Sequence, residues 1–283
     1  MNCRIFALCL TGCISAVVAN AEPVAMVTDV SGGVSVMENG KAKKVLLLSY
    51  LEPGATLQLD ANAQLTATLF TKPVEYHFAG PVKLTVAQDK IIAGDGKAET
   101  HVVSLQKTSA AKKFTANQRE SVAQAAFEMR AGRPGLLLDD PVDTSLVNPD
   151  AIFSWDGPRP TGGYQFTLYD NHNRILHHAS LTSKSWTPAT GLLRAGNAYE
   201  WEIKAELENG EVLTARGKFS VADQITAQTI EAQSAASDAS FSSRVLYAVF
   251  LENNGFKYDA RHIWKALAKE RPDDLVVSEH ATR

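Results

Sequence analysis

Residues 198–207 alternate between apolar and polar side chains, and this alternation constrains the fold more than any other feature. Side chains of a β-strand point alternately to opposite faces. The pattern therefore predicts a strand with a buried face that carries Trp201 and a solvated face that carries Glu202. The Asn-Gly pair at 209–210 suits a tight hairpin turn, and residues 212–221 resume with strand-like composition. We therefore expect a β-hairpin within a larger β structure.

Further short strands are expected before this hairpin, each bounded by residues that favour turns. They cover residues 136–138, 151–155, 164–170 and 174–180. Roughly seven short strands with regular turns are typical of an antiparallel sandwich of two packed sheets. We therefore expect a β-sandwich over residues 136–222.

The segment that leads into the best strand supports this fold. Residues 193–201 read Leu-Arg-Ala-Gly-Asn-Ala-Tyr-Glu-Trp, which resembles the tyrosine-corner segment of fibronectin type III and Ig-like domains. That family often has proline where this chain has Ala195. The resemblance implies a sandwich of about 70 to 85 residues, and it implies little about function because this scaffold hosts many unrelated sites.

The first 21 residues have the composition of a secretory signal peptide. A single positive charge at Arg4 precedes an apolar run at 5–18, and Ala19 and Ala21 form a small-x-small cleavage site. The apolar run is short for a membrane span, so we expect cleavage after Ala21, a periplasmic or secreted location and no transmembrane segment in the mature chain. The alternative is lipoprotein processing at Cys13, because residues 10–13 read Leu-Thr-Gly-Cys and resemble a lipoprotein box.

All three cysteines of the chain, Cys3, Cys9 and Cys13, lie in this leader. Cleavage after Ala21 leaves a mature protein without cysteine, which excludes disulfides, thiolate catalysis and cysteine metal sites. The formal net charge of the whole chain is -3. A mild charge of this sign does not favour nucleic-acid binding.

Residues 22–106 are expected to form a small β domain. Expected strands cover residues 24–29, 33–37, 56–59, 64–70, 74–78 and 83–86. In the strand at 64–70, Leu65 and Ala67 alternate with Thr66 and Thr68, which predicts one buried and one solvated face.

Three segments of this region resemble the FecR-like β domain of bacterial envelope proteins. They are Val-Thr-Asp-Val-Ser-Gly at 27–32, Leu-Glu-Pro-Gly-Ala-Thr-Leu at 51–57 and Phe-Ala-Gly-Pro-Val at 78–82. The resemblance implies a domain that is often joined to other noncatalytic modules at the periplasm or cell surface. The protein after which the family is named also has a transmembrane helix and a segment that binds a sigma factor. This chain shows neither, so that role is not carried over.

Helices are expected on both sides of the sandwich. A connector at 107–135 contains a helix at 115–130, and the C-terminal region at 223–283 contains helices at 224–235, 241–254 and 258–270. The last two resemble a tetratricopeptide-type hairpin. Their apolar surface exceeds what two facing helices can cover. We expect either a docking surface for a partner around Phe250 and Phe256 or complete internal burial.

No catalytic or metal-binding motif is visible in the sequence. None of the seven histidines has the spacing HExxH or a comparable ligand spacing, and the neighbours His177 and His178 should point to opposite faces of a strand. P-loop and GxSxG motifs are also missing. We therefore expect no enzyme activity, no cofactor and no metal. Trp155 is expected in the core, whereas Trp186 beside Pro188 is a candidate for stacking on a partner such as a sugar.

Together these features predict a mostly β protein with α-helices. It would consist of a FecR-like β domain, a connecting helix, an Ig-like or fibronectin III-like β-sandwich and a C-terminal helical hairpin. The leading interpretation is a noncatalytic exported envelope protein that binds or positions an envelope protein or peptidoglycan. The alternative is a glycan-binding or glycan-processing envelope protein. No pattern indicates an oligomeric state.

Overall fold

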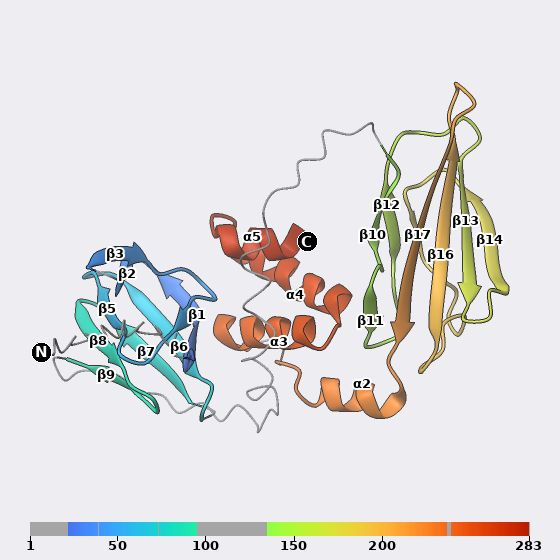
Figure 1. Ribbon diagram of the computed structural model, residues 1–283. Coiled ribbons are helices and arrows are strands. Elements are labelled where there is room, and N and C mark those ends of the chain that lie inside the picture. The colour runs from blue at the N-terminus through green and yellow to red at the C-terminus, as the bar shows by residue number, and fades with distance from the viewer. Residues whose placement is uncertain (1–21, 39, 73, 95–134, 237–238, 283) are drawn as a thin grey trace, which may run out of the picture.

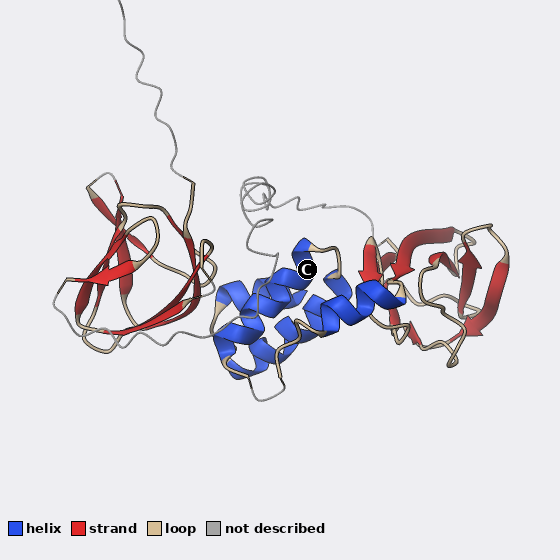
Figure 2. Ribbon diagram, turned by 90° about the horizontal axis from the view of Figure 1, so that it is seen from below, coloured by secondary structure: helices blue, strands red, loops and turns tan. Residues whose placement is uncertain are grey.

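The computed structural model describes residues 22–38, 40–72, 74–94, 135–236 and 239–282. The leader expected at 1–21 and the helix expected at 115–130 lie outside these residues. Figures 1 and 2 show an elongated arrangement in which a group of helices lies between two β units. The expected fold class, mostly β with α-helices, is confirmed. The helices are α2 (Gln224–Glu231), α3 (Phe241–Asn253), α4 (Lys257–Glu270) and α5 (Leu275–Thr282).

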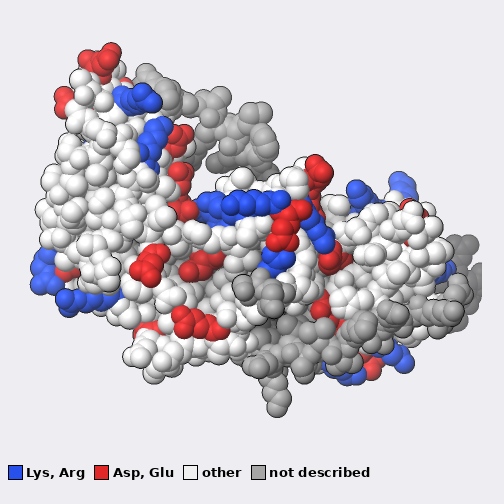
Figure 3. Space-filling view, turned by 180° about the vertical axis from the view of Figure 1, so that it is seen from behind, with Lys and Arg blue, Asp and Glu red and all other residues white. Residues whose placement is uncertain are grey.

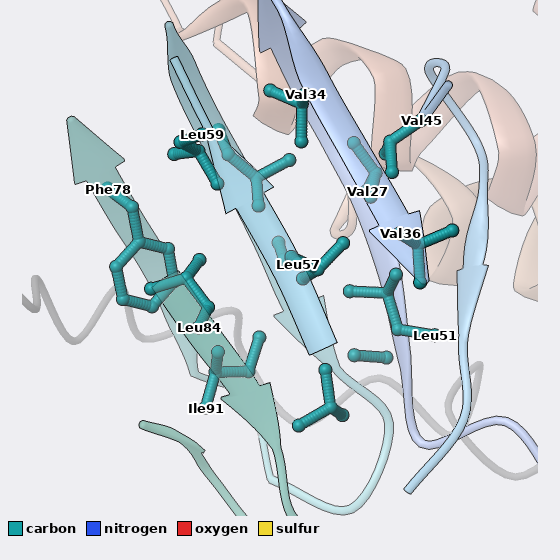
Figure 4. Packing of buried hydrophobic residues seen from close by; sticks show 14 of the residues in the cluster. Val27, Val34, Val36, Val45, Leu51, Leu57, Leu59, Phe78, Leu84 and Ile91 are labelled. Atoms are coloured by element: carbon teal, nitrogen blue, oxygen red, sulfur yellow. The ribbon is translucent and has the colours of Figure 1, made fainter. Parts of the chain in front are cut away.

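Two facing sheets form the N-terminal β unit, which we define as residues 22–94. One sheet has the strand order β4-β1-β6-β7, and the other has the order β3-β2-β5-β8-β9. Apolar side chains between them form a core that includes Val27, Leu57 and Phe78 (Figure 4). The strands are β1 (Ala25–Ser31), β2 (Val34–Glu38), β3 (Lys41–Lys44), β4 (Tyr50–Leu51), β5 (Thr56–Leu59), β6 (Gln64–Leu69), β7 (Glu75–Ala79), β8 (Val82–Val86) and β9 (Ile91–Ala93).

The sheet that contains β1 is buried on its inner face and over part of its outer face. Val27 points into the core of the N-terminal β unit, whereas its neighbour Met26 belongs to the apolar cluster of the helices. Thr66 and Thr68 on β6 are buried as well. The expectation of a solvated second face is therefore wrong. The alternation correctly separates the two faces, but helix α3 packs against β1 and removes part of the second face from water.

The second β unit, residues 135–222, is a sandwich of a three-stranded sheet, β10-β12-β15, and a five-stranded sheet, β11-β17-β16-β13-β14. Its core contains the ring of Phe153, which meets those of Phe166 and Trp201 edge to face at 5.4 and 5.2 Å. The strands are β10 (Leu137–Asp140), β11 (Thr144–Leu146), β12 (Phe153–Asp156), β13 (Tyr164–Asp170), β14 (Ile175–Leu181), β15 (Ser185–Trp186), β16 (Ala198–Glu206) and β17 (Val212–Val221).

The hairpin of β16 and β17 has the expected register around Trp201. This side chain is 0% exposed, and its indole Nε1 donates a hydrogen bond to the carbonyl oxygen of Pro141 at 2.8 Å. Gly217 lies opposite Trp201, and a Cβ at this position would lie 3.1 Å from the indole nitrogen. Glycine therefore leaves room for the indole. Tyr199 forms the corner contact, because its hydroxyl oxygen accepts a hydrogen bond from the backbone N–H of Arg194 at 2.7 Å.

The C-terminal helices form the central part of the molecule. Helix α3 begins after Ser240, whose hydroxyl oxygen accepts from the N–H of Ser243, and a turn at Gly255 leads into α4. The expected apolar stripe of α4 is confirmed, because Ala260, Trp264 and Leu267 are buried. Helix α5 was not expected. Among the described residues, no helix is long and apolar enough to cross a bilayer.

Candidate functional site

The candidate site is the region where α3 and α4 contact both β units, which we call the helical joint. Its apolar cluster takes Met26 and Leu47 from the N-terminal β unit, Val147 from the sandwich, and Trp264 and Leu267 from α4. One core is thus shared by three parts of the chain. Relative motion is the usual expectation for domains in tandem unless their interface is large and hydrophobic. A shared core of this kind opposes such motion.

The sandwich caps the first turn of α4. The residue before this helix, Phe256, offers no side-chain cap, so the N–H groups of the first turn need another acceptor. Thr144 supplies it, since its hydroxyl oxygen accepts from the N–H of Tyr258 at 3.2 Å. The N–H of Ser145 donates in turn to the carbonyl oxygen of Gly255 at 2.8 Å. The start of α4 is therefore completed only when the helix is docked on β11.

Two charged side chains of α4 extend this contact with the sandwich. Asp259 accepts a hydrogen bond from the N–H of Val147 at 3.0 Å, and Arg261 lies 2.6 Å from a carboxylate oxygen of Asp140. Burial raises the pKa of Asp140, and the nearby Arg261 guanidinium offsets part of this effect. The Asp140–Arg261 pair is shielded from solvent, so loss of either partner would leave a poorly solvated charge.

The other end of the helical joint contacts the N-terminal β unit. Arg271, at the C-terminus of α4, binds Asp29 with two nitrogens at 2.5 and 2.9 Å. Its guanidinium also lies over the ring of Phe241 on α3, 3.6 Å from the ring centroid. A bidentate pair fixes orientation as well as distance. Arg271 therefore joins α3, α4 and β1.

Asp259 makes the helical joint sensitive to pH. Burial raises the pKa of this carboxyl from 3.8 to about 6, although the hydrogen bond from the Val147 N–H acts in the opposite direction. The folded protein therefore binds this proton more tightly than the unfolded chain does. The resulting stabilisation is complete below the unfolded pKa of 3.8 and is lost as the pH rises through about 6.

Asp259→Asn should therefore raise the free energy of unfolding at about pH 7.5 by about 2 kcal/mol, because the amide can still accept from Val147 without a buried charge. The gain should disappear near pH 4, where the wild-type carboxyl is already protonated in the folded state. Chemical denaturation at both pH values measures the difference. Asp273→Asn, at an exposed position, is the control. A gain of equal size at both pH values would contradict the assignment.

Phe250 and Phe256 do not form an exposed docking surface. Phe256 is 4% exposed and packs into the apolar cluster of the helical joint, so internal burial is the correct one of the two expected alternatives for this residue. Phe250 is half-buried, and its ring stacks on that of Tyr247 with centroids 6.2 Å apart. Helical spacing could not reveal this outcome, because it does not show that a β sheet covers the other side of the hairpin.

Trp186 is the last residue of the edge strand β15, and its side chain faces β14 of the other sheet. Its ring stacks on His177 with centroids 4.7 Å apart and lies 4.4 Å from the ring of Phe166. Much of its surface is thus used to close the gap between the two sheets. His178 points to the other face, as expected, and its Nδ1 lies 2.9 Å from the hydroxyl of Thr167. Trp155 is buried, as predicted.

Glu202 is buried, although the alternation predicts it in solvent. It lies on the outer face of the five-stranded sheet and is only 2% exposed, because the long side chains of Arg216 and Lys204 contact its carboxylate at 2.5 and 3.0 Å. Burial acts to raise the pKa of Glu202, but the hydrogen bonds from Lys204 and Arg216 outweigh it and hold that pKa below its usual value. Arg216 also contacts Glu200 at 3.0 Å and lies over the ring of Tyr169.

A shallow groove of about 640 Å³ lies beside this ionic network, between the end of the sandwich and the turn that precedes α4. Hydroxyl, amide and carboxylate groups predominate among its side chains, which suits a polar ligand with many hydrogen-bonding groups. The lining residues are Asp143, Thr144, Ser145, Asp170, Asn171, Asn173, Ala198, Tyr199, Glu200, Arg216, Lys218, Phe219, Ser220 and Gly255.

The surface charge is mixed. On the face shown in Figure 3, acidic and basic side chains are interspersed and do not gather into one broad area of a single sign. Within the described ranges, no three His, Cys, Asp or Glu side chains are grouped as a metal-ligand set.

Comparisons with known proteins add little to this description. No family model and no curated protein matches the chain. Among solved structures, CopC from Methylosinus trichosporium OB3b is similar to part of this chain. The match covers 32% of this chain and 96% of the CopC chain, with 10% sequence identity and a TM-score of 0.27. A likeness of this size carries no argument about function.

Proposed function

We propose that this chain is a noncatalytic scaffold of the bacterial cell envelope that positions two β modules relative to each other for protein or cell-wall partners. The observation that carries the proposal is the helical joint. Helix α4 binds the sandwich through its N-terminal turn and Arg261, and Arg271, the residue that follows its last turn, binds the N-terminal β unit. A single rigid element thus sets the separation of the two modules.

The location in the envelope is supported by sequence. Residues 1–21 have the charged start, apolar run and small-x-small end of an export signal. The three segments that resemble the FecR-like domain fall on strands and turns of the N-terminal β unit: 27–32 on β1 and the following turn, 51–57 on β4 and β5, and 78–82 on β7 and β8. These features support an exported protein of noncatalytic modules.

The scaffold proposal predicts the effect of removing both ion pairs of the joint. Arg261→Ala combined with Arg271→Ala should leave both β units folded but loosen their relative placement, because the contacts that fix orientation are lost. Small-angle scattering should show a larger radius of gyration, and capture of partners from envelope extract should fall. Lys184→Ala is the control, since Lys184 pairs with Asp156 on the sandwich and both side chains are exposed.

Two results would count against the scaffold. An unchanged radius of gyration in the double variant would show that these pairs do not set the arrangement. Turnover of a cell-wall substrate by the wild-type protein would show an enzyme.

A glycan-binding function is the second candidate, and the polar groove favours it. Binding of the wild-type protein to purified peptidoglycan, and its loss in Asn171→Ala, would support this candidate. Equal binding by both proteins would place the glycan elsewhere.

A further inference from the structure

Strand β14 is the longest edge strand among the described residues. Each sheet of the described residues has two edge strands, and β14, with seven residues, is the longest of them. The next in length, β7, has five. An edge strand presents backbone N–H and C=O groups that have no partner in their own sheet, which makes it a template for pairing with another strand.

The side chains of β14 do not protect this edge. Its sequence, Ile-Leu-His-His-Ala-Ser-Leu, contains no Lys, Arg, Asp, Glu or Pro, and Ile175 and Leu176 are 63% and 37% exposed. The edge strand β3, in contrast, reads Lys-Ala-Lys-Lys and is exposed throughout. Charged residues, lysine above all, are a usual protection against edge pairing. The same chain thus protects one sheet edge with charge and leaves a longer one without it.

We propose that β14 pairs with β14 of a second copy of this chain, in antiparallel orientation, so that the five-stranded sheets of two sandwiches become continuous. This inference goes beyond the scaffold function. The choice of a second copy follows from charge. A strand without charged side chains is best matched by a neutral strand, and β14 itself meets this requirement in a two-fold symmetric pair.

The flanks of β14 are compatible with this pairing. Arg174 before the strand binds Asp170 at 2.6 Å, and Lys184 after it binds Asp156 at 2.5 Å. A two-fold axis near Ala179 places Arg174 opposite Lys184 of the second copy, and each of these cations already has a carboxylate partner in its own chain, which lowers their repulsion. The irregularity in the β13–β14 pairing lies near the start of β14 and leaves residues 177–181 in regular register. A two-fold axis near Ala179 then places side chains of the same face opposite each other.

The position of the edge leaves room for a second chain. In Figure 1, β14 lies at the far side of the sandwich from the helices and from the N-terminal β unit. Pairing through β14 joins two molecules sandwich to sandwich, with their N-terminal β units at opposite ends. The result is a bivalent scaffold.

Light scattering coupled to gel filtration tests the pairing on the processed chain that begins at Glu22. We expect a dimer whose fraction rises with concentration between about 1 and about 500 µM. Leu176→Lys combined with His178→Lys should weaken association by at least about tenfold through like-charge repulsion across the pair. Val212→Lys is the matched control, because Val212 is an exposed apolar residue of β17 in the same sheet.

A cysteine scan gives a second readout that does not depend on the lysine variant folding. His178→Cys, Ala179→Cys and Ser180→Cys are made singly and oxidised with diamide. A residue near the two-fold axis faces its own copy with Cβ atoms about 5 Å apart, so at least one variant should form a disulfide-linked dimer, whereas Val212→Cys should not. Three results would overturn the proposal. They are a monomer at every concentration, a dimer that Val212→Lys weakens as much as the Leu176→Lys and His178→Lys double variant does, and cross-linking at position 212 alone.

Discussion

Trp201→Ala is expected to lower the free energy of unfolding of the sandwich by about 3 to 5 kcal/mol, the usual cost of removing a fully buried large aromatic side chain. The indole contacts the rings of Phe153, Trp155 and Phe166. Its removal leaves a cavity between the two sheets, which Gly217 on the opposite strand cannot fill. It also removes the donor to the Pro141 carbonyl oxygen. Urea denaturation followed by circular dichroism measures the loss.

The control for this variant is Glu206→Ala on the same strand. Glu206 is exposed, so its truncation should change stability by no more than about 0.5 kcal/mol. Glu202 cannot serve as the control, because it is buried and paired with Arg216 and Lys204. Equal losses for Trp201→Ala and Glu206→Ala would refute the register of β16.

Phe256→Asp is expected to unfold the helical joint. Loss of a buried phenylalanine costs about 3 to 5 kcal/mol, and a carboxylate without a partner in the same site adds a further desolvation cost. Phe256 also precedes the turn of α4 that Thr144 caps, so the damage should reach the contact with the sandwich. Circular dichroism should show a loss of helix signal, and proteolysis should begin within α3 and α4.

Phe250→Asp is the matched control for this second prediction. Phe250 is half-buried and its ring lies against Tyr247, so a carboxylate there can still reach water. We expect this variant to remain folded with a smaller loss of stability. The two positions carry the same substitution six residues apart, but Phe256 is the N-cap of α4, where Asp is a favoured residue, and Phe250 lies in the last turn of α3, where a carboxylate is unfavourable. These local preferences alone would make Phe250→Asp the more harmful change, so a larger loss for Phe256→Asp reports burial. Equal loss of structure would mean that Phe250 is also essential to the core.

The same joint explains how a small group of helices can fix two β units. Isolated short helices are marginal in water, and most of their stability in proteins comes from packing. Helix α4 depends on the sandwich for a cap and on β1 for the partner of Arg271. Helix formation and module placement are therefore coupled.

Local patterns were sufficient for much of the fold. The alternation through residues 198–207 places Trp201 in the core, and the Asn-Gly turn appears with Gly210 at a φ of 78°. The helical stripe of Ala260 and Trp264 is buried as expected. These features could be predicted because the period of a strand or helix is set by its own backbone, whatever it later packs against.

The short strands β3, β4, β9, β11 and β15 were not expected. Each has two to four residues, and a strand this short shows no periodicity. Such segments become strands only because a longer neighbour offers hydrogen-bonding partners. In β11, for instance, Thr144 pairs with Phe219, which lies far along the chain on β17.

Only the tertiary structure decided which faces of the strands are buried. The two-residue period of β1 places Met26 and Val27 on opposite faces of the strand. Both are nevertheless buried, because α3, more than 200 residues later, packs against β1. Glu202 is buried because Arg216 on the next strand lies over it, and Thr144 caps a helix that begins 113 positions further along, at Lys257. The sequence determined the direction of each side chain, whereas burial and capping depend on neighbours that only folding brings together.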